Sequence, residues 1–374
     1  MQSPFHPVLG ASLFLAVLPC LCADEPPSAP AAGRPVVDVA FVLDTTGSMG
    51  GLIEGAKKKI WSIANAILTG EPRPEVRLAL VGYRDQGDAY VTRRNDFSDN
   101  IDVVYDRLRG FAAEGGGDTP EYVEQALKEA IDDLAWSPKA SLRVIYLVGD
   151  APPHEYEDGL DLPSLCRRAV EKGIIINTIR CGGAEDTGRV WDDIARRSEG
   201  RFLSIDQSGG MVAVATPFDR ELGDWNDRLV DTRLVYGTEE YQSAAGRRLE
   251  GQKDLAEDAK AGCAGWNDSN GRLDRQDLLD ACGSEPVVAV LARIPAKDLP
   301  EALQGKTPEE QKALIEKLLA QRREISEQIA GLNRKRDEFV RAEDAKRVDA
   351  KDSFDAKAFE ALKEQAAKHG ITYK

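Results

Sequence analysis

The sequence lacks the main signatures of nucleic-acid-binding, zinc-binding and membrane-spanning proteins. Its 374 residues carry a formal net charge of -15, which argues against nucleic acid as a partner. None of its six cysteines forms a CxxC pair, which argues against a zinc site. Residues 8–23 form an apolar run that is short for a membrane helix, which needs about 20 residues. With 42% hydrophobic residues, the chain can still bury a substantial core in two or three structural units.

The first 23 residues contain no Lys, Arg, Asp or Glu, and small residues end their apolar run near Ala23. This pattern predicts a secretory signal peptide over residues 1–23, followed by a linker rich in Pro and Ala over residues 24–35. The basic start typical of signal peptides is missing, and a retained membrane anchor is the alternative. We therefore expect a secreted or periplasmic protein with no integral membrane span after signal cleavage.

Four cysteines lie beyond the predicted signal peptide, at Cys166, Cys181, Cys263 and Cys282. An even number of cysteines in an exported protein predicts disulfides. Pairing by proximity joins Cys166 to Cys181 and Cys263 to Cys282, but four cysteines allow three connectivities. A helix and a strand rise by different amounts per residue. A helical Cys166 and a Cys181 at the end of a strand would therefore lie at different heights, which disfavours a disulfide between them unless the loop curls back.

Apolar strand patterns and amphipathic helix patterns alternate over the segment expected to form the main domain, residues 36–230. Its first strand has apolar residues on both faces, as expected of a strand covered on both sides. A QGD turn separates two further strands that we expect to pair as an antiparallel hairpin. The alternation predicts an α/β fold, a doubly wound and mostly parallel sheet with helices on both faces. The expected strands are residues 36–43, 76–82, 90–97, 142–148, 174–179 and 201–205, and the expected helices are residues 52–68, 101–108, 120–134, 162–171, 190–197 and a closing helix at 211–229.

Oxygen-bearing side chains follow two of these strands and lie in one glycine-rich loop. Asp44, Thr46 and Ser48 come directly after the first strand, and Asp150 follows the fourth. Thr119 lies in the loop GGGDT, just before a helix. Because ligands of such sheets bind at the carboxyl ends of the strands, we expect the three loops to converge. Two carboxylates and three hydroxyls suit a hard divalent ion such as Mg²⁺, with Mn²⁺ or Ca²⁺ as alternatives.

These motifs, DTTGS, GGGDTPE and LVGDAPPH, together resemble the metal-ion-dependent adhesion site of von Willebrand factor A-type (VWA) domains. The resemblance covers about residues 36–230, and Thr stands where the first hydroxyl is more usually Ser. It implies that three hydroxyls coordinate the ion directly, that two carboxylates act largely through water, and that an Asp or Glu of a protein partner completes the site. It also implies a binding module rather than an enzyme. The side chains at the motif positions are Asp44, Thr46, Ser48, Thr119 and Asp150.

Other interpretations of the same residues remain open. DTTGS after a strand also resembles the phosphate-transfer loop of haloacid-dehalogenase-like phosphatases, in which Asp44 would attack phosphate, but that scheme gives GGGDT no role. The glycines near Ser48 do not form the GxGxxG of a dinucleotide site. Asp44, Thr46 and Ser48 could merely cap the first helix, which explains one loop but not three. A purely structural protein of an envelope assembly is a further alternative.

GYRD, GGGDTPE and DAPPH are further similar to VWA domains joined to atypical alpha-type kinases, although no kinase unit follows here. His154 lies near the expected site, and we expect this loop histidine to be solvated rather than catalytic. Acidic residues surround the expected site, so a partner would present one carboxylate flanked by basic groups, unless these acids are only a hydrated surface. They are Glu114, Asp118, Glu121, Glu155, Glu157 and Asp158.

Residues 231–306 give few clear signals and are expected to be partly helical. The motif DSNG resembles part of a calcium loop, but Trp266 takes its first ligand position and cannot bind an ion, so we expect a polar turn. Residues 307–374 are predicted to form a helical, coiled-coil-like region that begins with the capping box TPEE. Half of one row of its heptad seam is arginine, which favours packing against its own chain, with helix 354–369 as a candidate, over self-association.

Overall fold

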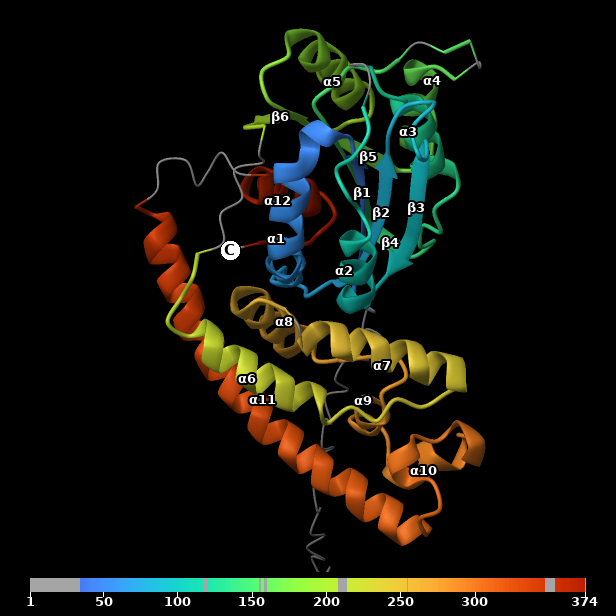
Figure 1. Cartoon of the computed structure of the whole chain (residues 1–374), viewed down its shortest axis with the longest axis vertical. Helices are drawn as coiled ribbons and strands as arrows, with labels where there is room; N and C mark the ends of the chain where they lie inside the picture. Colours follow the sequence, from blue (N-terminus) through green and yellow to red (C-terminus); the bar gives the residue numbers. More distant parts are fainter. Residues whose placement is uncertain are drawn as a thin grey trace, which may run out of the picture. The chain divides into compact units, whose positions relative to one another are not determined.

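A six-stranded sheet forms the core of the structure (Figure 1), in the order β3-β2-β1-β4-β5-β6. The computed structural model describes residues 34–374 except 117–119, 155, 158–159, 208–213, 254, 347–353 and 374. All neighbouring strands are parallel except the antiparallel pair β2 and β3, which confirms the predicted fold class and hairpin. The strands are β1 Val36–Asp44, β2 Glu75–Tyr83, β3 Thr92–Ser98, β4 Ala140–Gly149, β5 Ile174–Cys181 and β6 Phe202–Ile205.

Strand β1 is covered on both faces, as its sequence predicts. Val37, Val39 and Phe41 pack in one core layer, and Ala40 and Val42 pack in the other. Helices α1, α2 and α12 cover the first face, and α3, α4 and α5 cover the second. These helices are α1 Gly50–Leu68, α2 Ile101–Arg109, α3 Val123–Asp132, α4 Leu162–Glu171, α5 Glu185–Arg197 and α12 Phe354–Ala367.

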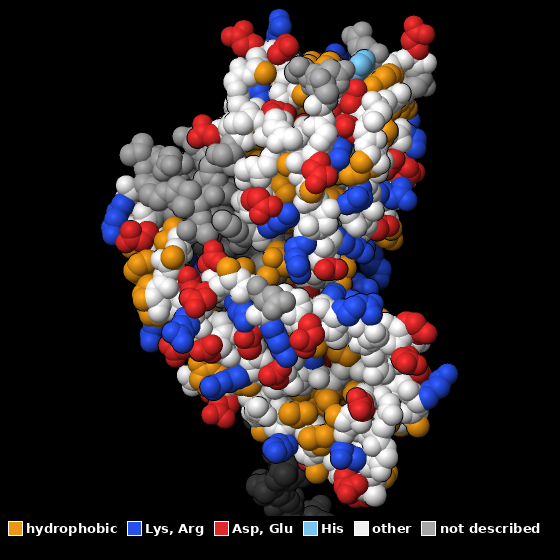
Figure 2. All heavy atoms as spheres, viewed as in Figure 1, with side chains coloured by type: hydrophobic (Ala, Val, Ile, Leu, Met, Phe, Trp, Pro, Cys, Tyr) orange, Lys and Arg blue, Asp and Glu red, His pale blue; other side chains and the backbone are white. Residues whose placement is uncertain are grey.

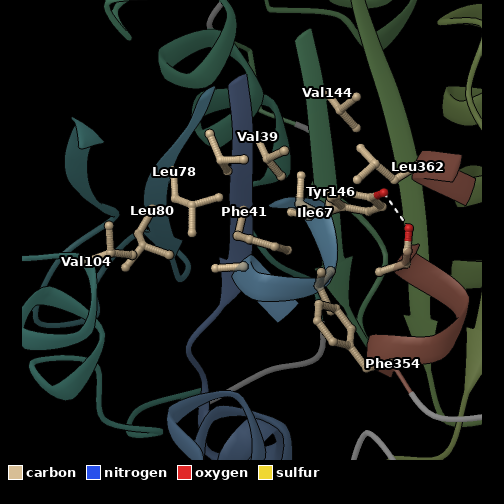
Figure 3. Packing of buried hydrophobic residues seen from close by; sticks show 14 of the residues in the cluster. Val39, Phe41, Ile67, Leu78, Leu80, Val104, Val144, Tyr146, Phe354 and Leu362 are labelled. Carbon is tan, nitrogen blue, oxygen red and sulfur yellow. Dashed lines mark hydrogen bonds between the residues drawn. The ribbon is translucent and has the colours of Figure 1, made fainter. Parts of the chain in front are cut away.

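Helix α12 closes the sheet, instead of the helix expected at residues 211–229. The chain returns from its far end to place α12 beside α1 and against β4 (Figure 3). The ring of Phe354 packs against Phe41 at a centroid distance of 6.1 Å. The hydroxyl of Tyr146 donates a hydrogen bond of 2.6 Å to the carbonyl of Ala358. An amphipathic pattern shows that a helix has an apolar face but not which surface that face covers, so the sequence alone favoured the nearer helix.

A buried pair of amides fixes the position of α12 on the sheet. Asn177 in β5 and Gln365 in α12 exchange two side-chain hydrogen bonds, of 3.0 and 2.7 Å. Asn177 is fully buried and Gln365 is 4% exposed. The Oδ1 atom of Asn177 also accepts from the backbone N–H of Arg201. A buried donor without a partner costs free energy, so another placement of α12 would leave the side-chain N–H of Asn177 unsatisfied.

Between β6 and α12 the described chain forms six α-helices, and α11 packs against α6, α8, α9 and α10. This confirms that α11 packs against its own chain, although its partner is not α12. The predicted capping box at Thr307 is present at its start. Residues 34–374 cluster as one unit, and the domain boundaries expected at residues 230 and 306 remain predictions. The helices are α6 Asp219–Val230, α7 Glu239–Lys253, α8 Glu257–Asn270, α9 Leu278–Cys282, α10 Val287–Ala292 and α11 Pro308–Asp344, with the short 3-10 helices η2 Ala296–Asp298 and η3 Glu301–Leu303.

The arginines in the seam of α11 find acidic partners within the chain. Arg322 donates hydrogen bonds to both oxygens of Asp277 and to Asp280. Arg336 pairs with Asp219 of α6 at 2.8 Å. Helix α8 continues through DSNG as far as Asn270, so the expected polar turn begins only after it. Asp277 binds the guanidinium of Arg322 and caps α9.

The four cysteines, all within the described residues, are free thiols, so the disulfide prediction is wrong. Cys166 packs in the core on one face of the sheet and Cys181 in the core on the other, so the sheet itself separates them. Cys263 is fully buried in the core beside α1, whereas Cys282 packs in the cluster around α10 and α11. An even count of cysteines does not reveal that each thiol fills a separate apolar site.

Charged side chains of both signs are spread over the face shown in Figure 2. Hydrophobic side chains gather between α10 and α11 on this face, and Val288 of α10 is 64% exposed. Among the described helices, none is both long and apolar enough to cross a membrane. The predicted signal peptide lies outside the described residues.

Candidate metal site

Two neighbouring parallel strands bring the two predicted carboxylates to one edge of the sheet. Asp44 is the last residue of β1, and Asp150 directly follows β4. The hydroxyl of Tyr83 donates to the carbonyl of Val148, 3.2 Å away. A Cβ atom on Gly149 would lie 2.4 Å from that hydroxyl and 3.3 Å from the Cβ of Asp44. Glycine at this position therefore allows the ends of β1 and β4 to approach each other.

The first loop folds back on Asp44. The Oδ1 atom of Asp44 accepts hydrogen bonds from the backbone N–H of Thr46, at 2.9 Å, and from its hydroxyl, at 2.7 Å. The hydroxyl oxygens of Thr46 and Ser48 lie 3.4 Å apart. No side chain caps the short helix η1, Gly47–Met49, or helix α1. The interpretation of these residues as helix caps is therefore wrong.

The second carboxylate oxygen of Asp44 lacks an ordinary partner. Asp44 is fully buried, and its Oδ2 atom accepts no hydrogen bond from the described residues. Burial raises the pKa of Asp44 to about 7, the bonds from Thr46 lower it in part, and the nearby Asp150 carboxylate raises it further. A buried acid beside a second acid is stabilised by a nearby cation, so the residues present fit a metal ion.

The glycine-rich loop contacts the first loop, although Thr119 lies outside the described residues. The backbone N–H of Gly47 donates to the carbonyl of Gly115 at 3.3 Å, and the N–H of Glu114 donates to the carbonyl of Thr45 at 3.2 Å. The chain therefore reaches the site just before Thr119. Glu121, two residues after Thr119, also lines the site.

These loops line an open pocket of about 240 Å³, and the lining residue Thr46 is bonded to the buried Asp44. This volume is sufficient for a hydrated divalent ion. Ser48 is exposed to solvent at the pocket, so another molecule can reach it. Within the described ranges, no three His, Cys, Asp or Glu side chains cluster closely enough to hold a metal, so a site here depends on hydroxyl oxygens. The lining residues are Thr46, Gly47, Ser48, Gly115, Gly116, Glu121, Asp150 and Ala151.

The acids expected around the site differ in exposure. Glu114 and Glu157 are exposed, whereas Glu121 is buried. Asp206, just after β6, is a further exposed acid. Asp118, Glu155 and Asp158 lie outside the described residues.

Sequence reasoning missed two residues that hold the site loops. The side-chain amide of Gln207 donates to the Oδ2 atom of Asp150 at 2.5 Å. Asp88 accepts a hydrogen bond of 3.3 Å from the backbone N–H of Gly116. A Cβ atom on Gly115, which has a φ of +81°, would lie 2.4 Å from the Oδ1 atom of Asp88. A lone Gln in a loop carries no signal, and Asp88 was recognised only as part of a turn.

His154 is bonded to another side chain and only partly exposed, so the expectation that it is simply solvated is wrong, and its non-catalytic role stays a prediction. Its side chain is 34% exposed, and Nδ1 lies 3.2 Å from the Oδ2 atom of Asp85, which follows β2. The ring stacks on Tyr156 at 4.3 Å, and Tyr156 donates to the same carboxylate at 2.6 Å. The backbone N–H of His154 donates to the carbonyl of Glu121. This cluster joins the loops after β2 and β4 beside the pocket.

Comparison with known proteins identifies the domain. Residues 38–216 match the family model described as the von Willebrand factor A domain. A putative ariadne-like RING finger protein of Acanthamoeba polyphaga mimivirus is 34% identical over 126 residues, 34% of this chain and 12% of that protein. Hemicentin-2 of Mus musculus is 30% identical over 207 residues, 53% of this chain and 4% of that protein. The chain thus spans only a small part of the length of these relatives.

Solved structures of VWA domains also align with part of this chain, at low sequence identity and low TM-score. The VWA domain of SpRpn10 aligns with 46% of this chain and 89% of its own, with 15% sequence identity and a TM-score of 0.36. A score this low adds nothing to the assignment. The assignment rests on the match to the family model. The mostly parallel six-stranded sheet with helices on both faces agrees with it. Residues 38–216 therefore match the von Willebrand factor A domain in sequence and in fold class.

Proposed function

We propose that this VWA domain binds a divalent metal ion and, through it, an acidic group of a protein partner. Mg²⁺ is the preferred ion, with Mn²⁺ or Ca²⁺ as alternatives. VWA domains generally act as protein-interaction modules. The observation that carries the proposal is the buried Asp44, whose Oδ2 atom accepts no hydrogen bond from the described residues and which lies beside Asp150.

Each motif residue has a proposed task. Thr46, Ser48 and Thr119 would hold the ion directly, and Asp44 and Asp150 would hold its water molecules. Neutral hydroxyls leave a bound ion with uncompensated positive charge, which attracts a carboxylate from outside. Because Ser48 is exposed, an Asp or Glu side chain of a partner can reach this position.

A binding module explains the site better than a phosphatase does. A nucleophilic Asp44 would need to meet a phosphate group, but this side chain is fully buried and Thr46 holds its Oδ1 atom. We therefore propose a non-enzymatic role. We also propose export, because residues 1–23 combine an apolar run with the absence of charged side chains.

Calorimetric titration with Mg²⁺ and Mn²⁺ tests the metal. Wild-type protein should bind one ion, and Ser48→Ala, which removes a direct oxygen, should lower the affinity at least about tenfold. Ser243→Ala, in the distant helix α7, is the matched control and should bind as wild type does. No binding to wild type, or equal binding to Ser48→Ala, would contradict the proposal.

Recovery of partners tests the second step. Immobilised wild-type and Ser48→Ala proteins are incubated with an envelope extract, in Mg²⁺ or in EDTA. A partner that uses the ion should be retained only by wild type in Mg²⁺. Partners retained equally in EDTA would favour the purely structural alternative.

A further inference from the structure

Gln207 reaches the metal site from the edge of the sheet. It lies two residues after β6, the edge strand next to β5 (Figure 1). Its side-chain amide donates to the Oδ2 atom of Asp150, which follows β4. Because β5 lies between β4 and β6, the side chain of Gln207 must pass over the carboxyl end of β5.

The end of β5 has room for this side chain because Gly182 stands there. Gly182 has a φ of +73°, and a Cβ atom on it would lie 2.4 Å from the Oε1 atom of Gln207. The backbone N–H of Gly182 also donates to the carbonyl of Ile205, at 2.9 Å, which ties β6 to this turn. At the next residue, Gly183, a Cβ atom would meet open space. A side chain at residue 182 would therefore obstruct Gln207, whereas one at residue 183 would not.

Both hydrogen bonds donated by the Gln207 amide end on groups of the site loops. One goes to Asp150, and a longer one of 3.4 Å goes to the backbone carbonyl of Ser48. An amide is neutral, so it directs the carboxylate without cancelling its charge. With one oxygen of Asp150 held, the other keeps a constant direction, and such outer contacts commonly change metal affinity by 10- to 100-fold.

We propose that Gln207 is a positioning residue for the metal site, an inference that rests on the proposed function. It aims the Asp150 carboxylate, through the space above Gly182, at the water shell of the ion.

Two matched pairs of variants test the inference by Mn²⁺ calorimetry. Gln207→Met removes the amide and keeps the length of the side chain, and Gln86→Met changes an exposed Gln in the loop after β2. Gly182→Ala obstructs the path of Gln207 and also strains a backbone with positive φ, so the melting temperature in EDTA is measured beside the affinity, and Gly183→Ala adds the same methyl group in open space. Gln207→Met and Gly182→Ala should each bind Mn²⁺ about tenfold more weakly, and the two controls should bind as wild type does.

A spectroscopic readout separates positioning from a general loss of structure. The electron paramagnetic resonance spectrum of bound Mn²⁺ should broaden in Gln207→Met, because a freed Asp150 disorders the water shell, while the melting temperature in EDTA stays close to that of Gln86→Met. Unchanged affinity and spectrum in Gln207→Met would overturn this inference and leave the proposed function standing. Absence of Mn²⁺ binding to wild type would overturn both.

Discussion

The raised pKa of Asp44 predicts how the free energy of unfolding of the metal-free protein changes with pH. The folded protein holds this carboxyl with a pKa of about 7, against an ordinary value of 3.8. Because the folded state binds the proton more tightly than the unfolded state, Asp44 contributes stability at low pH. That contribution is lost as the pH rises from about 4 to about 7.

The size of this loss follows from the shift. At about 1.4 kcal/mol per pKa unit, the whole change is about 4 kcal/mol, and the part between pH 5 and pH 8 is about 2.5 kcal/mol. Asp44→Asn keeps the shape of the side chain and an oxygen for Thr46, but it cannot ionise. The unfolding free energy of wild type relative to Asp44→Asn should therefore fall by this amount between pH 5 and pH 8.

Urea denaturation of both proteins in EDTA at pH 5, 6, 7 and 8 measures this difference. Subtraction of the two curves removes the contribution of titrating groups that do not interact with Asp44, and Asp150 is the main group that does interact with it. Saturating Mg²⁺ at pH 8 should restore the stability of wild type and leave Asp44→Asn nearly unchanged. A difference that stays constant across the pH range would refute the burial argument for Asp44.

Three further predictions concern the rest of the fold. Gln365→Leu removes the amide partner of the buried Asn177 and should lower the free energy of unfolding by about 1–3 kcal/mol. The exposed control Gln321→Leu should change the free energy of unfolding little. Equal effects of the two variants would contradict the role given to the amide pair. Arg322→Met removes the ion-pair partner of Asp277 and Asp280 and should cost about 3–5 kcal/mol of unfolding free energy, with faster hydrogen exchange in α9. The exposed neighbour Arg323→Met should have neither effect, and slow exchange in α9 of Arg322→Met would exclude a structural role for the Arg322 ion pairs. Thiol titration of the unreduced, denatured protein should detect free Cys166, Cys181, Cys263 and Cys282, and any two protected thiols among them would restore the disulfide prediction.

Local patterns predicted the sheet well. Successive side chains of a strand point to opposite faces, so a strand with apolar residues at every position is buried on both faces. This pattern predicted β1 correctly, because Val37, Val39 and Phe41 pack on one face and Ala40 and Val42 pack on the other. The carboxyl ends of parallel strands share one edge, so Asp44 and Asp150 were expected together. Both inferences needed only the sequence close to each residue.

The contacts that sequence reasoning missed depend on distant parts of the chain. Helix α12 packs on the sheet through contacts such as the one between Gln365 and Asn177, which are 188 residues apart, and no periodic pattern encodes such a pair. Gln207 reaches Asp150 only because a positive φ at Gly182 leaves room. The thiols of Cys166 and Cys181 were expected to pair, yet the sheet lies between them.

Anomalous diffraction from crystals grown with Mn²⁺ tests the central claim most directly. The account predicts one strong peak in the pocket that Thr46 and Ser48 line, within about 2.5 Å of their hydroxyl oxygens. A crystal with Mn²⁺ bound elsewhere, and none between these hydroxyls and Asp150, would contradict it.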